Sequence, residues 1–348
     1  AALQGTARDI VVETDLYTAV LSTKGGTIQR FTLKQYKQFN QEDPVQVVDT
    51  TAGGTLSLSF TTPTRRQVDT RSLYFSADTD ADTVRVQDEA VSLTFAAPLG
   101  RGELRQTYTF HPDDYDLGLS IQQVNPASFV TRDGYEIAWH GGVPYSEGGD
   151  DEQEQQYSGL YAKNGEVIES ITLSGEEHSE KRVDGSVSWT AVKNKYFTAA
   201  LMPNNPEHVR GATLIGDKVA QAGGGVDVKN LSARLQFPRP RGQSEVDQFH
   251  LYAGPIDYYS LADYDRGLYG MVDYGWDWFE WITKPLAKYL YIPMLTYLGG
   301  GLPEATVASL GLPGWLAEGI PYGFVVILMA VLIKTLVYPL TKSSYRSM

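Results

Sequence analysis

Apolar and polar residues alternate along most of the chain between Ile10 and Ala253, in short runs separated by turns. Successive side chains of a β-strand point to opposite faces, so a period of two is typical of strands that bury one face. The runs with this pattern occupy residues 55–60, 83–87, 91–95, 104–110, 117–124, 135–140, 186–192, 233–237 and 247–253. Turn signals such as Gly25-Gly26 separate them, and no helical pattern intervenes. We therefore expect a mainly β protein built on a large antiparallel β-sandwich rather than on a parallel sheet.

Beyond Ile256 the pattern becomes helical. Between Asp273 and Leu298, polar residues fall on one helical face and large apolar residues on the other. Aromatic residues crowd this stretch: Tyr274, Trp276, Trp278, Trp281, Tyr289, Tyr291 and Tyr297. Such rings are favoured where apolar and wet surroundings meet, which predicts an amphipathic helix lying in the membrane interface; the alternative is an ordinary helix packed on the sandwich. Pro285 and Pro293 are expected to bend or divide it.

The most apolar stretch runs from Tyr322 to Leu340, nineteen residues with a single charged side chain, Lys334. A hydrocarbon core of about 30 Å needs roughly 20 helical residues, so the run predicts a transmembrane helix. Its Leu, Ile, Val and Phe residues favour insertion by roughly 3 to 7 kcal/mol, against about 3 kcal/mol for a central lysine. Because insertion is marginal, we expect Lys334 to face a water-filled cavity or a polar partner; the alternative is a lysine that reaches the interface.

Charge is distributed unevenly along the chain. The net charge is −13, whereas residues 271–348 hold five acidic and five basic side chains, so the acidity belongs to residues 1–270. This argues against nucleic acid as a partner and against electrostatic docking of that region on anionic lipid. Lys342 and Arg346 follow the apolar run, so the positive-inside rule places its C-terminal end in the cytoplasm and residues 1–321 outside. The chain begins without Met, and we expect any targeting segment to have been removed or left out.

Motifs for metal, nucleotide or hydrolytic chemistry are weak or missing. Four acidic residues have the spacing of calcium-loop ligands: Asp78, Asp80, Asp82 and Glu89. Thr83 stands where such a loop needs glycine, so an exposed acidic hairpin is the better interpretation. The acidic run at residues 150–154 is expected to be an exposed loop. The five histidines stand in no ligand spacing and the chain has no cysteine, so we expect no metal and no cofactor.

Several short sequence blocks carry a family resemblance. The C-terminal ones are Val272-Asp-Tyr-Gly-Trp-Asp-Trp-Phe279, Lys284-Pro-Leu286, Tyr322-Gly-Phe324 and Tyr338-Pro-Leu-Thr-Lys342. Earlier ones are Lys24-Gly-Gly-Thr-Ile28, Lys195-Tyr-Phe197 and Gly254-Pro255. With these blocks the chain resembles the bacterial YidC/Oxa/Alb family of membrane protein insertases, weakly through residues 43–185 and strongly after Ala253.

The resemblance implies a periplasmic supersandwich, an interfacial helix and the first of five core membrane helices, in a multi-pass protein of the bacterial inner membrane. In the family, a hydrophilic groove holds a positive side chain that receives polar parts of the substrate. Lys334 occupies the matching position, where many relatives carry arginine. The implied function is insertion and chaperoning of membrane proteins without enzymatic chemistry or cofactor. The implied partners are nascent membrane proteins, the Sec translocon with its accessory subunits, membrane lipid, and the ribosome through segments absent from this chain.

The expected domains are a periplasmic β-sandwich over residues 1–260, a helical segment over 261–298, a Gly/Pro-rich linker over 299–321, and a transmembrane helix with the start of a cytoplasmic segment over 322–348. Gly25 and Gly26 are expected to serve a turn, and Pro339 the cytoplasmic end of the helix. The alternative function is a membrane-tethered periplasmic sandwich that binds carbohydrate or resembles a sugar epimerase. That alternative needs convergent His and Glu residues in an open, aromatic-lined cleft, whereas the insertase hypothesis predicts no such cluster.

Overall fold

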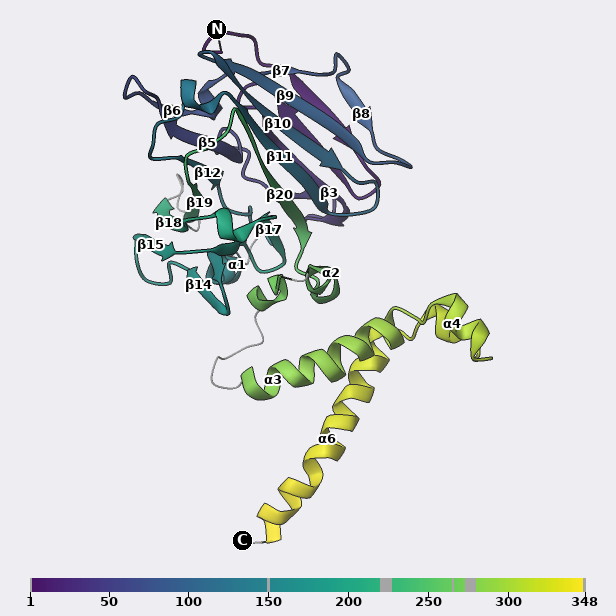
Figure 1. The fold of residues 1–348 in the computed structure, drawn as a ribbon. Helices are drawn as coiled ribbons and strands as arrows, with labels where there is room; N and C mark the ends of the chain where they lie inside the picture. The colour runs from purple at the N-terminus through teal and green to yellow at the C-terminus, as the bar shows by residue number, and fades with distance from the viewer. Residues whose placement is uncertain (1, 149–150, 220–226, 265, 273–279, 347–348) are drawn as a thin grey trace. The chain divides into compact units, whose positions relative to one another are not determined.

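The structure is a computed structural model that describes residues 2–148, 151–219, 227–264, 266–272 and 280–346. The chain divides into two compact units, residues 1–271 and 272–348. The first unit is built from β-sheets and the second from helices (Figure 1). The expectation of a mainly β protein with a large antiparallel sandwich is confirmed.

A nine-stranded sheet forms the largest layer of the first unit. Its strands, in spatial order, are β14 (Val167–Ile171), β13 (Gly159–Asn164), β16 (Val187–Lys193), β17 (Phe197–Pro203), β20 (Ser244–Pro255), β11 (Asp116–Val124), β10 (Gly102–Phe110), β9 (Val91–Leu99) and β7 (Ser76–Ala77). Neighbouring strands in this sheet are antiparallel, and the long β20 joins two groups of strands that are far apart in sequence.

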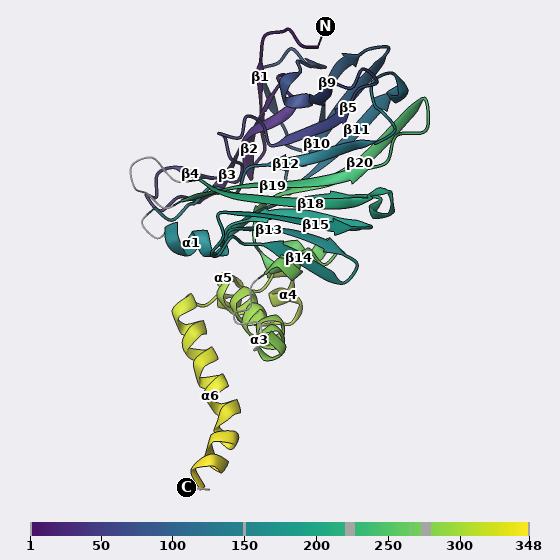
Figure 2. The ribbon, with the colours of Figure 1, turned by 90° about the vertical axis from the view of Figure 1, so that its left-hand side faces the viewer.

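Two smaller sheets complete the unit. A six-stranded sheet has the order β15 (His178–Asp184), β18 (Gly211–Val219), β19 (Val228–Phe237), β12 (Tyr135–His140), β5 (Leu56–Thr61) and β6 (Gln67–Asp69). A five-stranded sheet has the order β4 (Pro44–Gln46), β3 (Thr27–Lys37), β2 (Tyr17–Ser22), β1 (Asp9–Glu13) and β8 (Thr83–Arg85). The pairing of β1 with β8 is parallel. Figure 2 shows the strands of these layers from the side.

One contiguous apolar core lies between the sheets. In β10 the buried residues alternate with partly exposed ones, as the sequence pattern requires for a strand with one solvated face. Strand β17 differs, because all seven of its residues are buried. Its sequence therefore lacks alternation, so the period-two pattern did not predict this strand.

Short helices close the unit: η1 (Thr70–Ser72), η2 (Pro126–Ser128), α1 (Asp151–Tyr157), η3 (Pro206–His208), α2 (Tyr258–Asp263) and η4 (Leu268–Met271). The last two belong to the sandwich, since Leu261, Leu268 and Met271 are buried. Trp189 Nε1 donates to the Arg266 carbonyl at 3.1 Å and Lys193 Nζ to the Met271 carbonyl at 2.9 Å. The sandwich unit thus extends to Met271.

Two predictions for acidic segments need correction. Residues 151–154 are not an exposed loop, because helix α1 begins at Asp151 and Glu154 is fully buried. Asp150 lies outside the described residues. The Glu154 carboxylate accepts hydrogen bonds from Ser146 N at 2.7 Å, Glu147 N at 3.0 Å and Asn194 Nδ2 at 2.6 Å, which compensates for its burial. The acidic residues Asp78, Asp80, Asp82 and Glu89 are exposed but lie in no hairpin, since β7 pairs with β9 and β8 with β1.

The second unit contains α3 (Glu280–Leu286), the π-helical turns η6 (Ala287–Tyr291) and η7 (Met294–Gly299), α4 (Glu304–Ser309), α5 (Trp315–Glu318) and α6 (Tyr322–Arg346). The predicted amphipathic helix is observed from Glu280, and residues 273–279 lie outside the described part. Pro285 and Pro293 lie close to the changes from α- to π-helical turns, and the chain stays helical from Glu280 to Gly299. Helix α6 continues through Pro339, which does not end it. By length and hydropathy together, none of the helices in the described residues meets the requirement for a membrane span.

Candidate functional site

The predicted site residue, Lys334, lies in the middle of α6 and is exposed. Residues three, four and seven positions apart share one helical face, which places Ile327, Val331 and Tyr338 on the face of Lys334. All three of these side chains are exposed. Thr335, the residue after Lys334, is a second polar residue in this part of α6. Its Oγ1 donates to the Val331 carbonyl at 2.8 Å. Lys334 is therefore an exposed ammonium on an apolar helical surface.

The helical stretch of α3, η6 and η7, which precedes α4, differs from α6 in its exposed side chains. Trp281 and Tyr289 are 76% and 73% exposed, and the Lys288 ammonium lies 5.4 Å from the centre of the Tyr289 ring. Exposed aromatic rings beside a lysine are typical of a helix at a membrane surface, where the ring meets both apolar and polar surroundings. This arrangement agrees with the interfacial helix that the sequence predicts.

A His–carboxylate cluster in the sandwich unit was not predicted. His208 of η3 lies with its Nδ1 2.8 Å from Asp247 Oδ1 and its Nε2 3.3 Å from Glu245 Oε1, both on β20. The Tyr135 hydroxyl of β12 donates to the other oxygen of Asp247. Burial and the Asp247 charge raise the pKa of Tyr135 well above its ordinary value. His208 and the two acids are 37 or more residues apart in sequence, so only the pairing of the strands could reveal the cluster.

The cluster has one nitrogen and two carboxylate oxygens within 4.8 Å of one another, the donor set of a divalent-cation site. Its contacts, however, place each ring nitrogen of His208 against a different carboxylate. An ion bound through one nitrogen would break one of these contacts. The geometry fits a bridge between η3 and β20 better than a metal centre.

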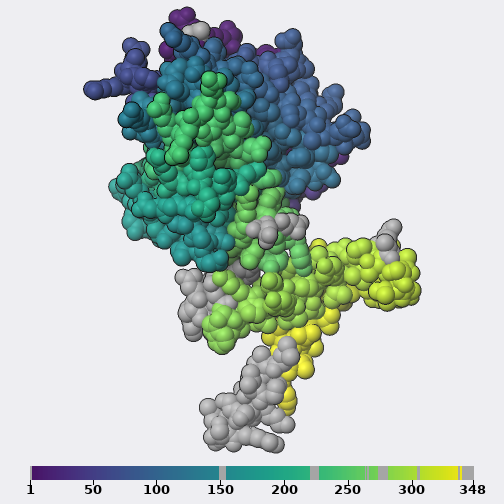
Figure 3. All heavy atoms as spheres, viewed as in Figure 1, coloured from purple at the N-terminus to yellow at the C-terminus, as the bar shows by residue number. Residues whose placement is uncertain are grey.

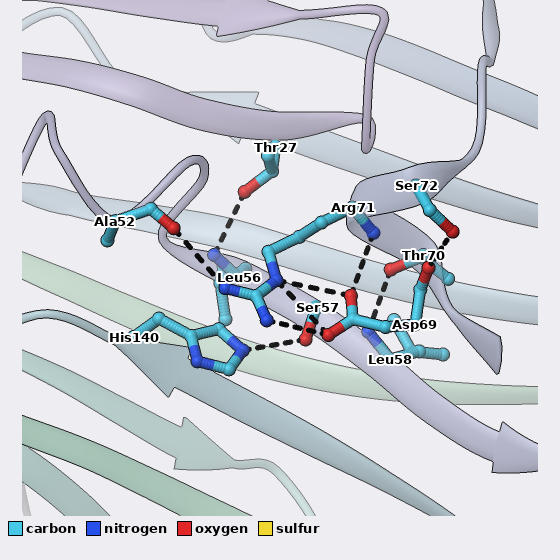
Figure 4. A network of polar contacts seen from close by, with 10 residues as sticks. All are labelled: Thr27, Ala52, Leu56, Ser57, Leu58, Asp69, Thr70, Arg71, Ser72 and His140. Atoms are coloured by element: carbon cyan, nitrogen blue, oxygen red, sulfur yellow. Dashed lines mark hydrogen bonds and ion pairs between the residues drawn. The ribbon is translucent and has the colours of Figure 1, made fainter. Parts of the chain in front are cut away.

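A second polar network surrounds His140 (Figure 4). His140 Nε2 lies 2.8 Å from Ser57 Oγ, and Arg71 holds Asp69 through Nε and Nη2, the latter at 2.8 Å. Arg71 Nη1 also donates to the Ala52 carbonyl at 3.3 Å. Burial, followed by the nearby Arg71 charge, lowers the pKa of His140 to about 4. The imidazole is thus neutral at neutral pH, and the network ties β5 and β12 to η1.

The comparisons with known proteins place the chain in a family. The YidC periplasmic domain family matches residues 9–289. The chain belongs to the YidC periplasmic domain family. A Membrane protein insertase YidC from Chlorobaculum parvum is 32% identical over 99% of this chain and 54% of that protein. Another from Chlorobium phaeovibrioides is 32% identical over 100% of this chain and 56% of that protein. The chain spans about half the length of these curated YidC relatives.

Among solved structures, a galactose mutarotase related enzyme from Lactobacillus acidophilus covers 70% of this chain and 97% of its own, with 9% identity and a TM-score of 0.42. A likeness this remote carries no argument about function. The carbohydrate alternative is instead judged by the side chains of this YidC periplasmic domain.

The structure brings His208 to Glu245, next to a cavity that Phe237 and Phe249 line. The cavity at this place has a volume of about 140 Å³. Small-molecule sites commonly enclose roughly 300 to 1,000 Å³. The cluster therefore lacks the open cleft that a sugar would need.

A larger cavity of about 390 Å³ lies beside Lys229 and is lined by Asp49 and Tyr145, with no histidine among its lining residues. Lys229 Nζ donates to the carbonyls of Gln155, Ser158 and Thr172, with 2.8 Å to Ser158. Burial, together with Lys218, lowers the pKa of Lys229 to about 8. Because all three ammonium hydrogens serve these carbonyls, Lys229 acts as a structural cation.

Proposed function

We propose that the chain is the periplasmic domain and first core membrane helix of a membrane protein insertase. The observation that carries this proposal is the family match over residues 9–289, together with an apolar helix that begins at Tyr322 and has a central lysine. The named relatives are membrane protein insertases, and each is about twice as long as the part matched here. The remaining membrane helices would come from the rest of the full-length protein.

In this proposal α6 crosses the inner membrane, with residues 1–321 in the periplasm and Lys342 and Arg346 at the cytoplasmic end. The successive domains are then the sandwich, the interfacial helix from Glu280, the segment 299–321 and α6. Lys334 faces a hydrophilic groove formed with the other helices, since an ammonium near the middle of a bilayer needs water or a polar partner. Membrane lipid surrounds the opposite face of α6.

The groove works without covalent chemistry. A hydrophilic notch shortens the apolar distance that a translocated polar segment must cross, and the Lys334 charge attracts acidic residues of that segment. The apolar helix of the substrate then moves into lipid. Nascent membrane proteins are the substrates, and the Sec translocon with its accessory subunits is a partner for part of them. No enzymatic step and no cofactor enter this mechanism.

A depletion-rescue experiment with the full-length protein tests the proposal. Cells depleted of their own insertase receive the protein with Lys334, with Lys334→Arg or with Lys334→Ala, at equal expression. The assay follows insertion of a small client with acidic residues in its translocated segment. We expect Lys334→Arg to retain insertion and Lys334→Ala to lose most of it, because arginine keeps the charge. Full activity of all three proteins would contradict the role of Lys334.

A further inference from the structure

The segment between η7 and α6, which its composition predicts to be a Gly/Pro-rich linker, contains the two short helices α4 and α5. Helices α4 and α5 form a hairpin whose two ends lie side by side. Leu302 N donates to the Leu316 carbonyl at 2.7 Å, and Ile320 N donates to the Leu298 carbonyl at 2.6 Å. These two bonds join the start of the segment to its end, so the hairpin has a closed base.

Two glycines make the closed base possible. Gly301 has a φ of +84°, and a Cβ on it would collide with the Ala317 carbonyl oxygen. Gly319 has a φ of +77°, and a Cβ on it would lie 2.8 Å from Gly301 N. Any other residue would push these backbones apart. Gly314, between the two helices, has open space around it and serves no such contact.

The tip of the hairpin is apolar and exposed. Val307 packs inward at 7% exposure, whereas Leu310, Leu312 and Trp315 are 67%, 36% and 54% exposed. No charged residue occurs between Glu304 and Glu318. Three neighbouring exposed apolar side chains on a short hairpin mark an interaction surface rather than a soluble loop. Figure 3 shows the yellow-green atoms of the hairpin at one end of the helical unit.

The base of the hairpin lies at the start of α6. Only three residues, 319–321, separate Glu318 from Tyr322, so the span between them is at most about 14 Å. A Cβ on Gly299 would collide with the Tyr322 ring, so the base and the first turn of α6 are in contact. Figures 1 and 2 both show α4 near the N-terminal end of α6, at the same level as α3. If α6 crosses a bilayer, the hairpin lies at its outer surface.

We propose that the α4–α5 hairpin is a second membrane-contact element, whose tip of Leu310, Leu312 and Trp315 inserts into the boundary between headgroups and acyl chains of uncharged lipid. This inference rests on the proposed crossing of α6. Trp favours that boundary, and the leucines bury apolar area there. Uncharged lipid is the occupant because the hairpin has no Lys or Arg to attract anionic headgroups, and Glu304 and Glu318 stand at its base.

The chain has no cysteine, so single labelling sites can be introduced one at a time. Leu312→Cys reports on the tip, Leu328→Cys on α6, and Thr64→Cys on an exposed turn of the sandwich. Each variant of the 348-residue chain carries an environment-sensitive fluorophore and is reconstituted into vesicles of phosphatidylcholine and phosphatidylethanolamine. Iodide quenches the fluorescence of a probe that is exposed to water. Lipids with a nitroxide near the headgroups or near the bilayer centre quench a probe at the corresponding depth.

We expect the Leu312 probe to be quenched several-fold more strongly by the shallow nitroxide than by the deep one, and to be protected from iodide. The Leu328 probe should respond to the deep nitroxide and the Thr64 probe to iodide. In a variant that also carries Leu310→Ser and Trp315→Ser, iodide should quench the fluorescence of the Leu312 probe. The quenching of the Leu328 probe should not change.

A Leu312 probe open to iodide while the Leu328 probe stays in lipid would overturn the hairpin inference alone and leave a protein partner as the occupant. Shielding of the Leu312 probe from all quenchers would mean burial in protein and would also overturn it. A Leu328 probe open to iodide would instead contradict the proposed crossing of α6.

Discussion

The sandwich unit and the helical unit treat charged and apolar groups in opposite ways. In the sandwich, buried charges have partners from the same unit: Glu154 has three N–H donors, Lys229 has three carbonyls, and Asp116 has His250 at 2.7 Å. In the helical unit, Lys334 stands on an apolar helix, and Trp281 and Leu310 are largely exposed.

The difference indicates which medium each unit needs. A unit that pairs its buried charges and encloses one apolar core needs no apolar medium. A unit with many exposed Leu, Val and aromatic side chains needs an apolar environment or a partner that covers them. This difference fits the proposed function, in which the sandwich faces water and the helical unit meets the membrane.

Truncation gives the strongest test of this comparison. Residues 1–271 alone should fold and remain soluble without detergent, because the sandwich is complete at Met271. Ending the chain at residue 260 removes the buried Leu268 and Met271 and the acceptors of Trp189 and Lys193. The cost should exceed about 5 kcal/mol in the free energy of unfolding. Urea unfolding of the two fragments measures it, and equal midpoints would show that residues 261–271 do not belong to the sandwich.

Glu154→Ala tests the internal compensation of a buried charge. The substitution leaves the donors of Ser146, Glu147 and Asn194 without their acceptor, and we expect it to lower the free energy of unfolding by about 4 kcal/mol. Gln156→Ala in the same helix changes an exposed side chain and should cost less than about 0.5 kcal/mol. Urea unfolding followed by near-ultraviolet circular dichroism compares them. Similar losses for both would mean that the Glu154 contacts do not stabilise the fold.

His140 makes the sandwich sensitive to acid. Its pKa of about 4 in the folded protein lies below the ordinary value of 6.5, so the unfolded chain binds the proton first. The stability from neutral His140 is present above pH 6.5 and is lost as the pH falls towards 4, by about 3 kcal/mol. In the variant His140→Asn the side chain at this position does not titrate. Its free energy of unfolding should therefore fall less steeply as the pH is lowered. Parallel stability curves for the two proteins from pH 7 to pH 4 would refute this account.

Opening the closed base of the α4–α5 hairpin should have a smaller effect on stability, and this effect lies in the helical unit. Gly319→Ala forces a Cβ against Gly301 at a positive φ and should open the base at a cost of about 1 kcal/mol. Gly314→Ala has open space and a φ of −59°, so it is the matched control. Hydrogen exchange of the Leu302 and Ile320 amides in the reconstituted chain should accelerate for Gly319→Ala only. Equal exchange in both variants would mean that the hairpin is not closed in this way.

Sequence patterns predicted the parts of this molecule whose signals are local. Alternation located strands such as β12, whose predicted and observed bounds agree at Tyr135–His140, because one face meets solvent. It missed β17, which is buried on both faces. Lys334 was singled out because a charge inside an apolar run is visible along the chain, and its role stays a prediction.

Non-local features escaped the sequence analysis. His208, Glu245 and Tyr135 meet only through the fold, on three different elements. The composition of residues 299–321 predicted a linker, since glycine and proline are typical of one. The structure shows that Gly301 and Gly319 are required for close backbone contacts, so the same composition describes a folded hairpin.

A charge exchange tests the central claim that the Lys334 ammonium meets acidic groups of the substrate. The full-length protein with Lys334 or Lys334→Glu is given two clients that differ only in whether their translocated segment carries aspartates or lysines. We predict that Lys334→Glu fails with the acidic client and recovers insertion of the basic one, because attraction replaces repulsion. If Lys334→Glu inserts the acidic client as well as Lys334 does, the charge has no role in substrate recognition and the proposed mechanism is wrong.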